Sequence, residues 1–322
     1  MDKVSIVVPV YNGQAHIKTC IESLIEQSWN CLEIIIVDDG SDDNSLDICK
    51  KYESIDERIT VIHQKNKGVS SARNAGIKCV TGQYLLFVDA DDFLEKNAVE
   101  CAINCLKNNN ADVVVFGWRN FSPVFGNGND VCFEESVADN SNLILKNLLE
   151  NYSAYGGGYP WNKLWKIEEN KKNLVYFNEN LYYFEDLEWV VQMICKNSTV
   201  CTCPGILYNY RLNEIGVTRD KSKTEYREIG YHKAIQSIIC FFHDNGNYEM
   251  EEWFQSKYFP EIINGIVGAQ RHKMNKLFEI LLPIFYKQWN KQLKLGGLTV
   301  KQTIRGIAIY ILYYERVKKY EE

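Results

Sequence analysis

An apolar, strand-like run near residue 85 ends abruptly in three carboxylates. The run is YLLFV, residues 84–88, and Asp89, Asp91 and Asp92 follow it closely. Charged side chains are costly to bury, and neighbouring carboxylates repel one another unless something compensates them. A divalent cation would do so, because Mg²⁺ and Mn²⁺ prefer oxygen ligands and commonly link carboxylates to substrate phosphates. The alternative is a strand followed by an Asp-capped helix.

A second pair of carboxylates, Asp38 and Asp39, follows the strand-like run EIIIV. An ionised carboxylate accepts hydrogen bonds, so Asp39 could accept one from a nucleobase imide or a ribose hydroxyl. Asp42 and Asp43, slightly further along, are typical of a helix-capping turn. The position of Asp38 and Asp39 at a strand end favours binding over capping for this pair.

A third pair, Glu185 and Asp186, stands in the aromatic surroundings of LYYFEDLEWV. Partial burial raises the pKa of a carboxyl group toward the range that suits a general base. The pair therefore indicates a group that could take a proton from a hydroxyl. The alternative is an amphipathic helix whose acidic side chains lie in water.

The elements that must position these motifs are short apolar strands alternating with amphipathic helices. Strands are predicted at 4–10, 33–37, 59–63, 84–88 and 112–116, and helices at 14–27, at about 45–52, after Gly68 and from about 96. This alternation predicts βαβ units and a mainly parallel α/β sheet flanked by helices.

In parallel sheets of this kind, ligands bind beyond the carboxyl ends of the strands. Three pairs of residues come just after predicted strands: Tyr11 and Asn12, Asp38 and Asp39, and Asp89 and Asp91. We therefore expect these side chains to converge on one crevice.

The remaining segments carry weaker signals. The stretch SPVFGNGND, residues 122–130, predicts a loop, and three glycines at 156–158 indicate a mobile loop or a simple turn. From about residue 221 the pattern is helical.

Composition excludes several classes of protein. The 322 residues carry a formal net charge of −6, which argues against a general nucleic-acid binder. The 11 cysteines lack a metal spacing, and Cys201 and Cys203 are too close together for a typical zinc half-site, so reduced, mostly buried thiols are expected. No signal peptide and no bilayer-spanning run is found, which predicts a cytosolic protein or one on a membrane surface.

Two common nucleotide-binding signatures are missing. The chain has neither GxGxxG nor GxxxxGK[ST], so a dinucleotide-binding Rossmann domain and a P-loop hydrolase both lose their sequence support. A nucleotidyltransferase is disfavoured as well, since there is no Gly-rich, Arg-containing phosphate loop near the N-terminus.

Taken together, seven motifs resemble those of family 2 glycosyltransferases, of the bacterial type that builds capsule, O-antigen or other surface polysaccharides. The resemblance is dense from residue 4 to about 125 and looser to about 218. It rests on PVYN, VDDGSDDNS, KNKGVSSARNAGI, TGQYLLFVDADD, PWNKLWK, FEDLEW and LYNYR.

The resemblance implies a GT-A fold over residues 1–218, with a nucleotide-sugar-binding half at about 1–112 and an acceptor half at about 113–218. A helical region would follow at 219–322. It also implies a nucleotide-sugar donor, most often a UDP-sugar, a saccharide or lipid-linked acceptor, an inverting displacement, and Mn²⁺ or Mg²⁺. A relative that binds such a donor or a partner enzyme without catalysis is the alternative.

By motif, the resemblance also assigns residues. Asp186 matches the catalytic base, with Glu185 beside it, and Asp91 is the expected direct metal ligand, with Asp89 towards the ribose. Which two of the three carboxylates at 89–92 act stays open. The expected nucleotide-sugar contacts are Pro9, Val10, Tyr11, Asn12, Asp38, Asp39, Gly68, Arg73, Asp89, Ala90 and Arg211, and the expected acceptor contacts are Trp161, Tyr183 and Trp189. For Arg211, an ordinary surface arginine is equally compatible with the sequence.

The C-terminal segment suggests contact with a membrane. Residues 291–322 carry seven Lys or Arg and three Glu, and aliphatic side chains interleave with tyrosines at 310, 313 and 314. A basic amphipathic helix can lie in the interface of an anionic bilayer, here the inner face of the cell membrane. The alternative is a helix packed on the protein's own core.

Overall fold

The computed structural model describes residues 2–122, 126–151, 154–212 and 223–317. The chain forms two compact units, Met1–Arg219 and Asp220–Glu322. The boundary predicted at residue 218 lies outside the described residues.

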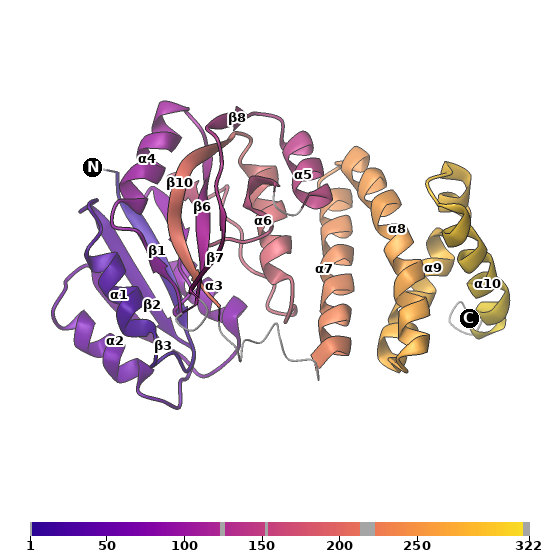
Figure 1. The fold of residues 1–322 in the computed structure, drawn as a ribbon, viewed down its shortest axis with the longest axis horizontal. Helices are drawn as coiled ribbons and strands as arrows, with labels where there is room; N and C mark the ends of the chain where they lie inside the picture. The colour runs from indigo at the N-terminus through magenta and orange to yellow at the C-terminus, as the bar shows by residue number, and fades with distance from the viewer. Residues whose placement is uncertain (1, 123–125, 152–153, 213–222, 318–322) are drawn as a thin grey trace. The chain divides into compact units, whose positions relative to one another are not determined.

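Unit 1 is built around a mixed sheet whose strand order is β3-β2-β1-β4-β9-β6-β10-β5 (Figure 1). Its first four strands are β1 (Val4–Val10), β2 (Leu32–Asp38), β3 (Ile59–His63) and β4 (Tyr84–Phe87). These four run parallel to one another. Short apolar runs joined by helices give this arrangement, because parallel strands need a crossover connection.

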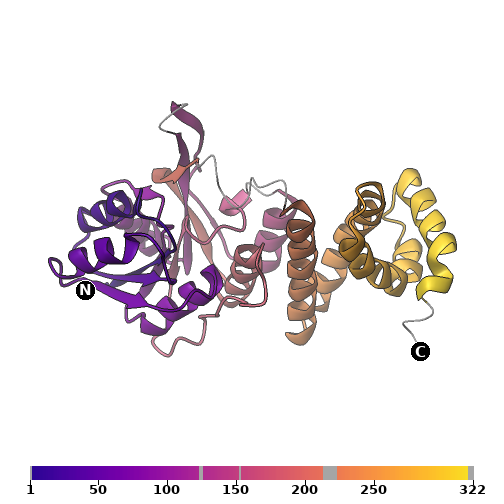
Figure 2. The same ribbon diagram turned by 90° about the horizontal axis from the view of Figure 1, so that it is seen from below.

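The other strands add antiparallel pairs. They are β5 (Phe93–Leu94), β6 (Val113–Ser122), β7 (Gly126–Val131), β8 (Ser136–Ala138), β9 (Lys163–Lys166) and β10 (Val200–Arg211). β9 lies antiparallel between β4 and β6, while β6 and β10 are parallel. β6 and β7 extend as a two-stranded ribbon (Figure 2), so the loop predicted at 122–130 is wrong in the part that the structure describes.

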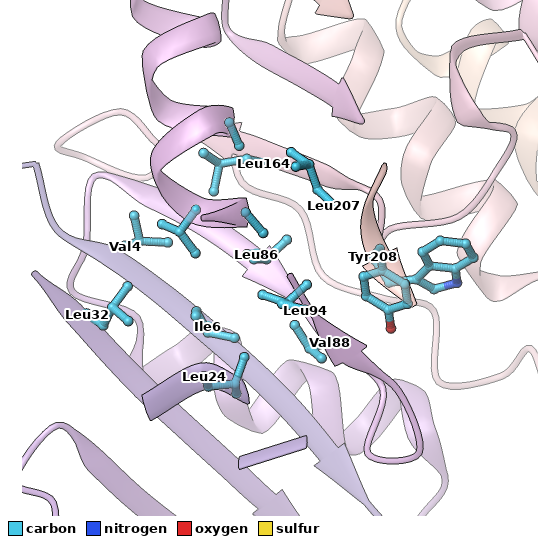
Figure 3. Packing of buried hydrophobic residues seen from close by; sticks show 14 of the residues in the cluster. Val4, Ile6, Leu24, Leu32, Leu86, Val88, Leu94, Leu164, Leu207 and Tyr208 are labelled. Atoms are coloured by element: carbon cyan, nitrogen blue, oxygen red, sulfur yellow. The ribbon is translucent and has the colours of Figure 1, made fainter. Parts of the chain in front are cut away.

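The helices of unit 1 cover the sheet and connect its strands. They are α1 (Ile17–Ile25), α2 (Ser45–Glu53), α3 (Val69–Cys79), α4 (Ala98–Asn108), α5 (Ser141–Glu150) and α6 (Glu185–Lys196), with one short 3₁₀ turn, Ala154–Gly156. α1 and α4 pack on the sheet face that carries Val4, Ile6 and Val8 (Figure 3).

Every residue of β1 is buried, because helices cover both faces of the sheet. On the face opposite α1 and α4, α3 approaches β1 closely at Gly76. A Cβ added to Gly76 would overlap Val7 Cγ1 and lie 3.1 Å from Val7 Cγ2. Only glycine allows this separation, and α3 carries a candidate site residue, Arg73.

Unit 2 consists of the helices α7 (Thr224–Asp244), α8 (Tyr248–Arg271), α9 (Asn275–Leu295) and α10 (Val300–Val317). It has its own apolar core, to which Phe242, Phe259 and Phe285 contribute fully buried rings. The predicted helical pattern is confirmed here. None of the helices in the described part of the chain combines the length and apolar character needed to cross a bilayer.

Candidate active site at the carboxyl edge of the sheet

The carboxyl ends of the first strands meet as predicted. Val10 pairs with Asp38, and Asp38 pairs with His63 on the next strand. β4 continues the edge, because Val7 pairs with Phe87, which lies shortly before Asp89 in the sequence. Topology therefore brings three of the sequence motifs to one edge of the sheet.

The loop after β1 and the loop after β2 are joined by hydrogen bonds. The Asn12 amide donates to Ser41 Oγ at 3.0 Å, and the Asp42 amide donates to Asn12 Oδ1 at 2.8 Å. Asp43 accepts from the Gln14 amide at 3.0 Å and from the Ser45 amide at 2.9 Å. Asp43 thus makes the turn that the sequence predicted, and it also fixes the two loops to each other.

Asp38 is completely buried at this edge and contacts two of the segments that form it. Its Oδ2 accepts from the Ser41 amide at 3.2 Å and contacts His63 Nδ1 at 2.8 Å. Its Oδ1 is buried without a hydrogen-bond partner. Asp38 therefore orients the half-exposed imidazole of His63, a residue that the sequence analysis did not single out.

Asp39 holds the segment between β3 and α3. Its carboxylate accepts from Gln64 Nε2 at 2.7 Å, from the Lys67 amide at 2.9 Å and from the Gly68 amide at 2.8 Å. Gly68 has φ 91°, which favours glycine, and it directly precedes α3. Asp39 and Gly68 together determine where α3 begins.

The PVYN segment has two buried residues followed by two exposed ones, Tyr11 and Asn12. Pro9 and Val10 are buried, whereas the ring of Tyr11 is 50% exposed at the edge and Ala90 is half-buried. A ligand at this edge would meet the Tyr11 ring rather than the side chains of Pro9 and Val10.

Arg73 on α3 is the central charge of the site. Its side chain is buried, and its guanidinium contacts Asp89 at 3.2 Å, Asp186 at 2.5 Å and Glu185 at 3.6 Å. The guanidinium also lies 5.1 Å from the centre of the Phe177 ring. One buried cation thus brings together the strand-end acid and both members of the Glu–Asp pair, although Asp186 is 113 residues from Arg73 in the sequence.

The next residue of α3 fixes the chain that leads to α6. Asn74 Nδ2 donates to the Phe177 carbonyl at 2.9 Å, and the Phe177 amide donates back to Asn74 Oδ1 at 2.7 Å. Helix α6 then begins at Glu185, directly after Phe184, whose φ of 61° is unusual for a bulky residue. The backbone turns sharply at the point where the candidate base is presented.

Burial raises the pKa of Asp186 to about 8, with Glu185 and Asp89 adding to the rise and Arg73 opposing it. Three carboxylates share one guanidinium here, so the cluster retains excess negative charge when all are ionised. Holding a proton on Asp186 relieves that excess. A carboxyl group with such a pKa can act as a general base near neutral pH.

The structure distinguishes the three carboxylates of the acidic motif. Asp92 is buried, accepting from Tyr208 Oη at 2.7 Å and from the Arg211 amide at 2.7 Å. Burial, together with Asp91 and Asp89, raises the pKa of Asp92 well above its usual value. Asp92 joins the motif to β10, which leaves Asp89 and Asp91 as the more accessible carboxylates.

Arg211 is not an ordinary surface arginine. Its Nε donates to the Asp91 carbonyl at 2.7 Å, and its guanidinium lies 5.2 Å from the centre of the Phe121 ring. Arg211 therefore holds a positive charge beside the acidic motif.

The carboxylates of Asp89 and Asp91 are suitable donors for a divalent cation, because Mg²⁺ and Mn²⁺ prefer oxygen ligands. No group of three or more His, Cys, Asp or Glu residues in the described part of the chain is arranged to hold a metal ion. Such a pair fits an ion that substrate phosphates help to bind, rather than one held by protein ligands alone.

The expected acceptor residues lie in different surroundings. Trp161 is almost buried in a stack of rings, 5.0 Å from Tyr159, 4.5 Å from Tyr208 and 5.5 Å from Tyr210 between ring centres. Tyr159 and Tyr210, which belong to the same group of rings, are half-buried.

Trp189 and Tyr183, the other two expected acceptor residues, differ in exposure. Trp189 has no exposed surface, since it stacks on Phe177 at 4.8 Å and donates to the Val175 carbonyl. It belongs to the core, so its expected contact with an acceptor is corrected. Tyr183 is half-buried.

Lys163 is a buried residue that the sequence analysis missed. Its ammonium donates to the carbonyls of Gly157 at 2.9 Å and Tyr159 at 2.8 Å, and to Asn162 Oδ1 at 2.9 Å. Burial lowers the pKa of Lys163 well below its usual value. Two of the three glycines at 156–158, Gly156 and Gly157, thus bind the lysine through their carbonyls, and the segment forms a turn close to Trp161.

Comparison with known proteins agrees with this geometry. A model of the family described as Glycosyl transferase family 2 matches residues 5–155. The chain is 28% identical over 283 residues to the glycosyltransferase GlyG of Streptococcus pneumoniae serotype 4, covering 74% of this chain and 94% of GlyG. It is 32% identical over 250 residues to the glycosyltransferase EpsJ of Bacillus subtilis, covering 76% of this chain and 70% of EpsJ.

The chain belongs to glycosyltransferase family 2.

The fold of this glycosyltransferase is also found among solved structures. S. aureus TarS 1-349, crystallised in complex with UDP-GlcNAc, superposes with a TM-score of 0.60 at 19% identity, over 90% of this chain and 92% of that one. The likeness confirms the predicted GT-A fold. The acidic edge described above is therefore the candidate active site of a family 2 glycosyltransferase.

Proposed function

We propose that this glycosyltransferase moves a sugar from a UDP-sugar to a hydroxyl group of a saccharide or lipid-linked saccharide, with inversion, during synthesis of a surface polysaccharide. The observation that carries the proposal is the Arg73 cluster. It places a carboxyl group of raised pKa, Asp186, opposite the strand-end carboxylate Asp89 across one guanidinium.

For the donor, the proposal is supported by the polar edge formed by the loops after β1, β2 and β3. TarS, which shares the fold, was crystallised with UDP and with UDP-GlcNAc. Here Tyr11 offers an exposed ring, and Asp39 fixes the segment that leads to α3. Arg211 supplies positive charge near the acidic motif, where it could face a diphosphate.

Asp89 and Asp91 would hold Mn²⁺ or Mg²⁺ together with the diphosphate. The ion, when bound, stabilises negative charge that develops on the departing nucleotide. Asp92 keeps the motif in place through Tyr208 and the Arg211 amide.

Asp186 would remove the proton from the attacking acceptor hydroxyl on the side opposite the leaving nucleotide. Inversion follows when the hydroxyl attacks the anomeric carbon directly, through a transition state that resembles an oxocarbenium ion. Glu185 and Arg73 would orient the carboxylate, and the Tyr159 and Tyr210 rings would offer flat apolar surfaces for a pyranose.

A donor screen tests the proposal. Release of UDP is measured from a panel of UDP-sugars with Mn²⁺, with Mg²⁺ and with EDTA, alongside equilibrium binding of UDP. We expect release that requires the metal and falls sharply in Asp91→Asn. Asp47→Asn, at an exposed acid on α2, is the matched control and should behave as the native protein.

Full release of UDP in the presence of EDTA, or by Asp91→Asn, would contradict the proposed requirement for a metal ion. Binding of UDP without turnover of any donor, with a folded protein, would support the inactive relative instead.

A further inference from the structure

Helix α10 of unit 2 has two apolar faces, and only one of them packs against the protein. On the packed side, Ile309 is buried, and a Cβ on Gly306 would overlap the Trp289 ring. Tyr286 Oη on α9 donates to the Tyr310 carbonyl at 2.5 Å. These contacts define the orientation of α10 about its axis.

The opposite face carries a row of exposed aliphatic side chains, here called the α10 stripe. Its members are Val300 (77% exposed), Ile304 (62%), Ile307 (45%) and Ile311 (69%). At 100° per residue their spacing keeps all four within an arc of about 60°. Scattered exposed apolar residues are common, but a continuous row of them is typical of a surface that contacts a protein or a membrane.

The stretch of sequence that contains the stripe carries charge of one sign from Lys287 to Arg305. Between Glu279 and Glu315 the chain has no Asp or Glu, whereas the remainder of this acidic chain has many. The basic residues in that interval are Lys287, Lys291, Lys294, Lys301 and Arg305. Lys301 is exposed one position after Val300, and Lys294 is exposed at the end of α9.

We propose that the α10 stripe lies in the surface of an anionic lipid bilayer. Lys291 pairs with Glu252 of α8 at 3.2 Å, so the cations that the proposal uses are the exposed Lys294 and Lys301. An exposed aliphatic row near such cations matches a helix lying flat in the interface, with apolar groups among acyl chains and Lys near lipid headgroups. A protein partner would have to supply an acidic and apolar surface together. The basic residues at 318–319, part of the segment predicted to contact membrane, lie outside the described residues.

This proposal uses only unit 2 and does not depend on the transfer reaction. Failure of one therefore leaves the other standing. If both hold, the bilayer would be the place where a lipid-linked acceptor is met.

Vesicle flotation with the full chain tests the proposal. We expect binding to vesicles of phosphatidylcholine with about one third phosphatidylglycerol at low salt, weak binding to pure phosphatidylcholine, and loss in 0.5 M NaCl because screening shortens electrostatic attraction. Ile304→Ser with Ile311→Ser should lower the partition coefficient between bilayer and water at least about tenfold, because two aliphatic side chains that would be buried among the acyl chains are lost.

Two matched controls separate the stripe from general effects. Ile55→Ser removes an exposed isoleucine (68%) from unit 1 and should leave vesicle binding unchanged. Lys294→Glu with Lys301→Glu should weaken binding to anionic vesicles, whereas Lys51→Glu with Lys78→Glu, at exposed positions of unit 1, should weaken it much less. Circular dichroism and thermal unfolding verify that each variant is folded.

Absence of binding to anionic vesicles at low salt would overturn the proposal, as would equal binding by folded Ile304→Ser/Ile311→Ser. A native dimer that this double variant converts to monomer, without vesicle binding, would assign the stripe to a second copy of the chain.

Discussion

Arg73 makes it possible for three carboxylates to lie together in a largely enclosed site. Its guanidinium contacts Asp89, Glu185 and Asp186, while Phe177 covers its face. Removing one partner from a buried charge cluster is costly because the remaining charges lose their compensation. The candidate base and the candidate metal-side acid therefore depend on the same residue.

At the residue scale, Asp186→Asn should lower the rate of sugar transfer by about 10²–10⁴-fold, the usual contribution of a general base. The amide keeps the shape of the side chain but cannot accept the proton. Donor affinity should change far less than the transfer rate. Transfer rate and UDP-sugar binding are the measurements.

Glu185→Gln is the matched variant, since Glu185 contacts the same guanidinium at the longer distance of 3.6 Å. It should reduce transfer less than Asp186→Asn. The assignment of the base would be wrong if Glu185→Gln were the more damaging change.

A second expectation concerns pH. Burial raises the pKa of Asp186 to about 8, above the usual value near 3.9. The folded protein thus holds a proton that the unfolded chain loses above about pH 4. The protonated Asp186 therefore contributes to the free energy of unfolding. This contribution is fully present below about pH 4 and is lost as the pH rises through about 8.

Activity should follow the opposite direction, because the base must be ionised. The pH profile of kcat/KM should rise through a limb at or below about pH 8, and the same limb should be missing from the residual activity of Asp186→Asn. An unchanged limb in that variant would assign the titration to another group.

At the element scale, the fit of α3 against β1 fixes where Arg73 lies. Gly76→Ala should destabilise the protein by about 1–3 kcal/mol, as overpacking in a core does, because its Cβ meets Val7. Gly268→Ala on α8 is the control, since no atom lies within 4 Å of the added Cβ. It should stabilise by up to about 1 kcal/mol through helix propensity.

Thermal and urea unfolding measure both changes. Adding Val7→Ala to Gly76→Ala should recover part of the loss, as expected for two residues in contact. Equal effects of Gly76→Ala and Gly268→Ala would mean that α3 can shift away from the sheet without cost.

Some elements could be predicted closely from the sequence. The runs at 4–10 and 59–63 coincide with β1 and β3, because continuous apolar segments bounded by turn residues leave little ambiguity. The hairpin strand β7 was missed. Its sequence, GNGNDV, favours a turn, and only pairing with β6 makes it a strand.

The site was predictable in its parts but not in its connections. Asp89, Asp91 and Asp186 could be proposed from local composition. The contact between Arg73 and Asp186 could not, because it joins residues that are 113 positions apart and depends on how α3 and α6 approach each other. Lys163 gives no signal of burial either, since a lysine is normally exposed.

At the scale of the whole molecule, the carboxylates that contact Arg73 come from two distant stretches of unit 1. Asp89 follows β4, whereas Asp186 lies in the first turn of α6, after the chain has passed through β5 to β9. Unit 2 adds a separate apolar core and the α10 stripe. The catalytic proposal and the membrane proposal therefore concern different units and can be tested separately.

The shared guanidinium has a thermodynamic consequence. Whatever cationic group binds beside Asp89 also favours ionisation of Asp186, because both belong to one set of interacting charges. Below about pH 8, binding of Mn²⁺ alone should therefore expel a proton from the protein. Titration calorimetry in buffers of different ionisation enthalpy would count that proton, and Asp186→Asn should abolish its release. By reciprocity, mild acid should weaken the binding of Mn²⁺, so occupancy of the metal site would depend on whether Asp186, the candidate base, holds its proton.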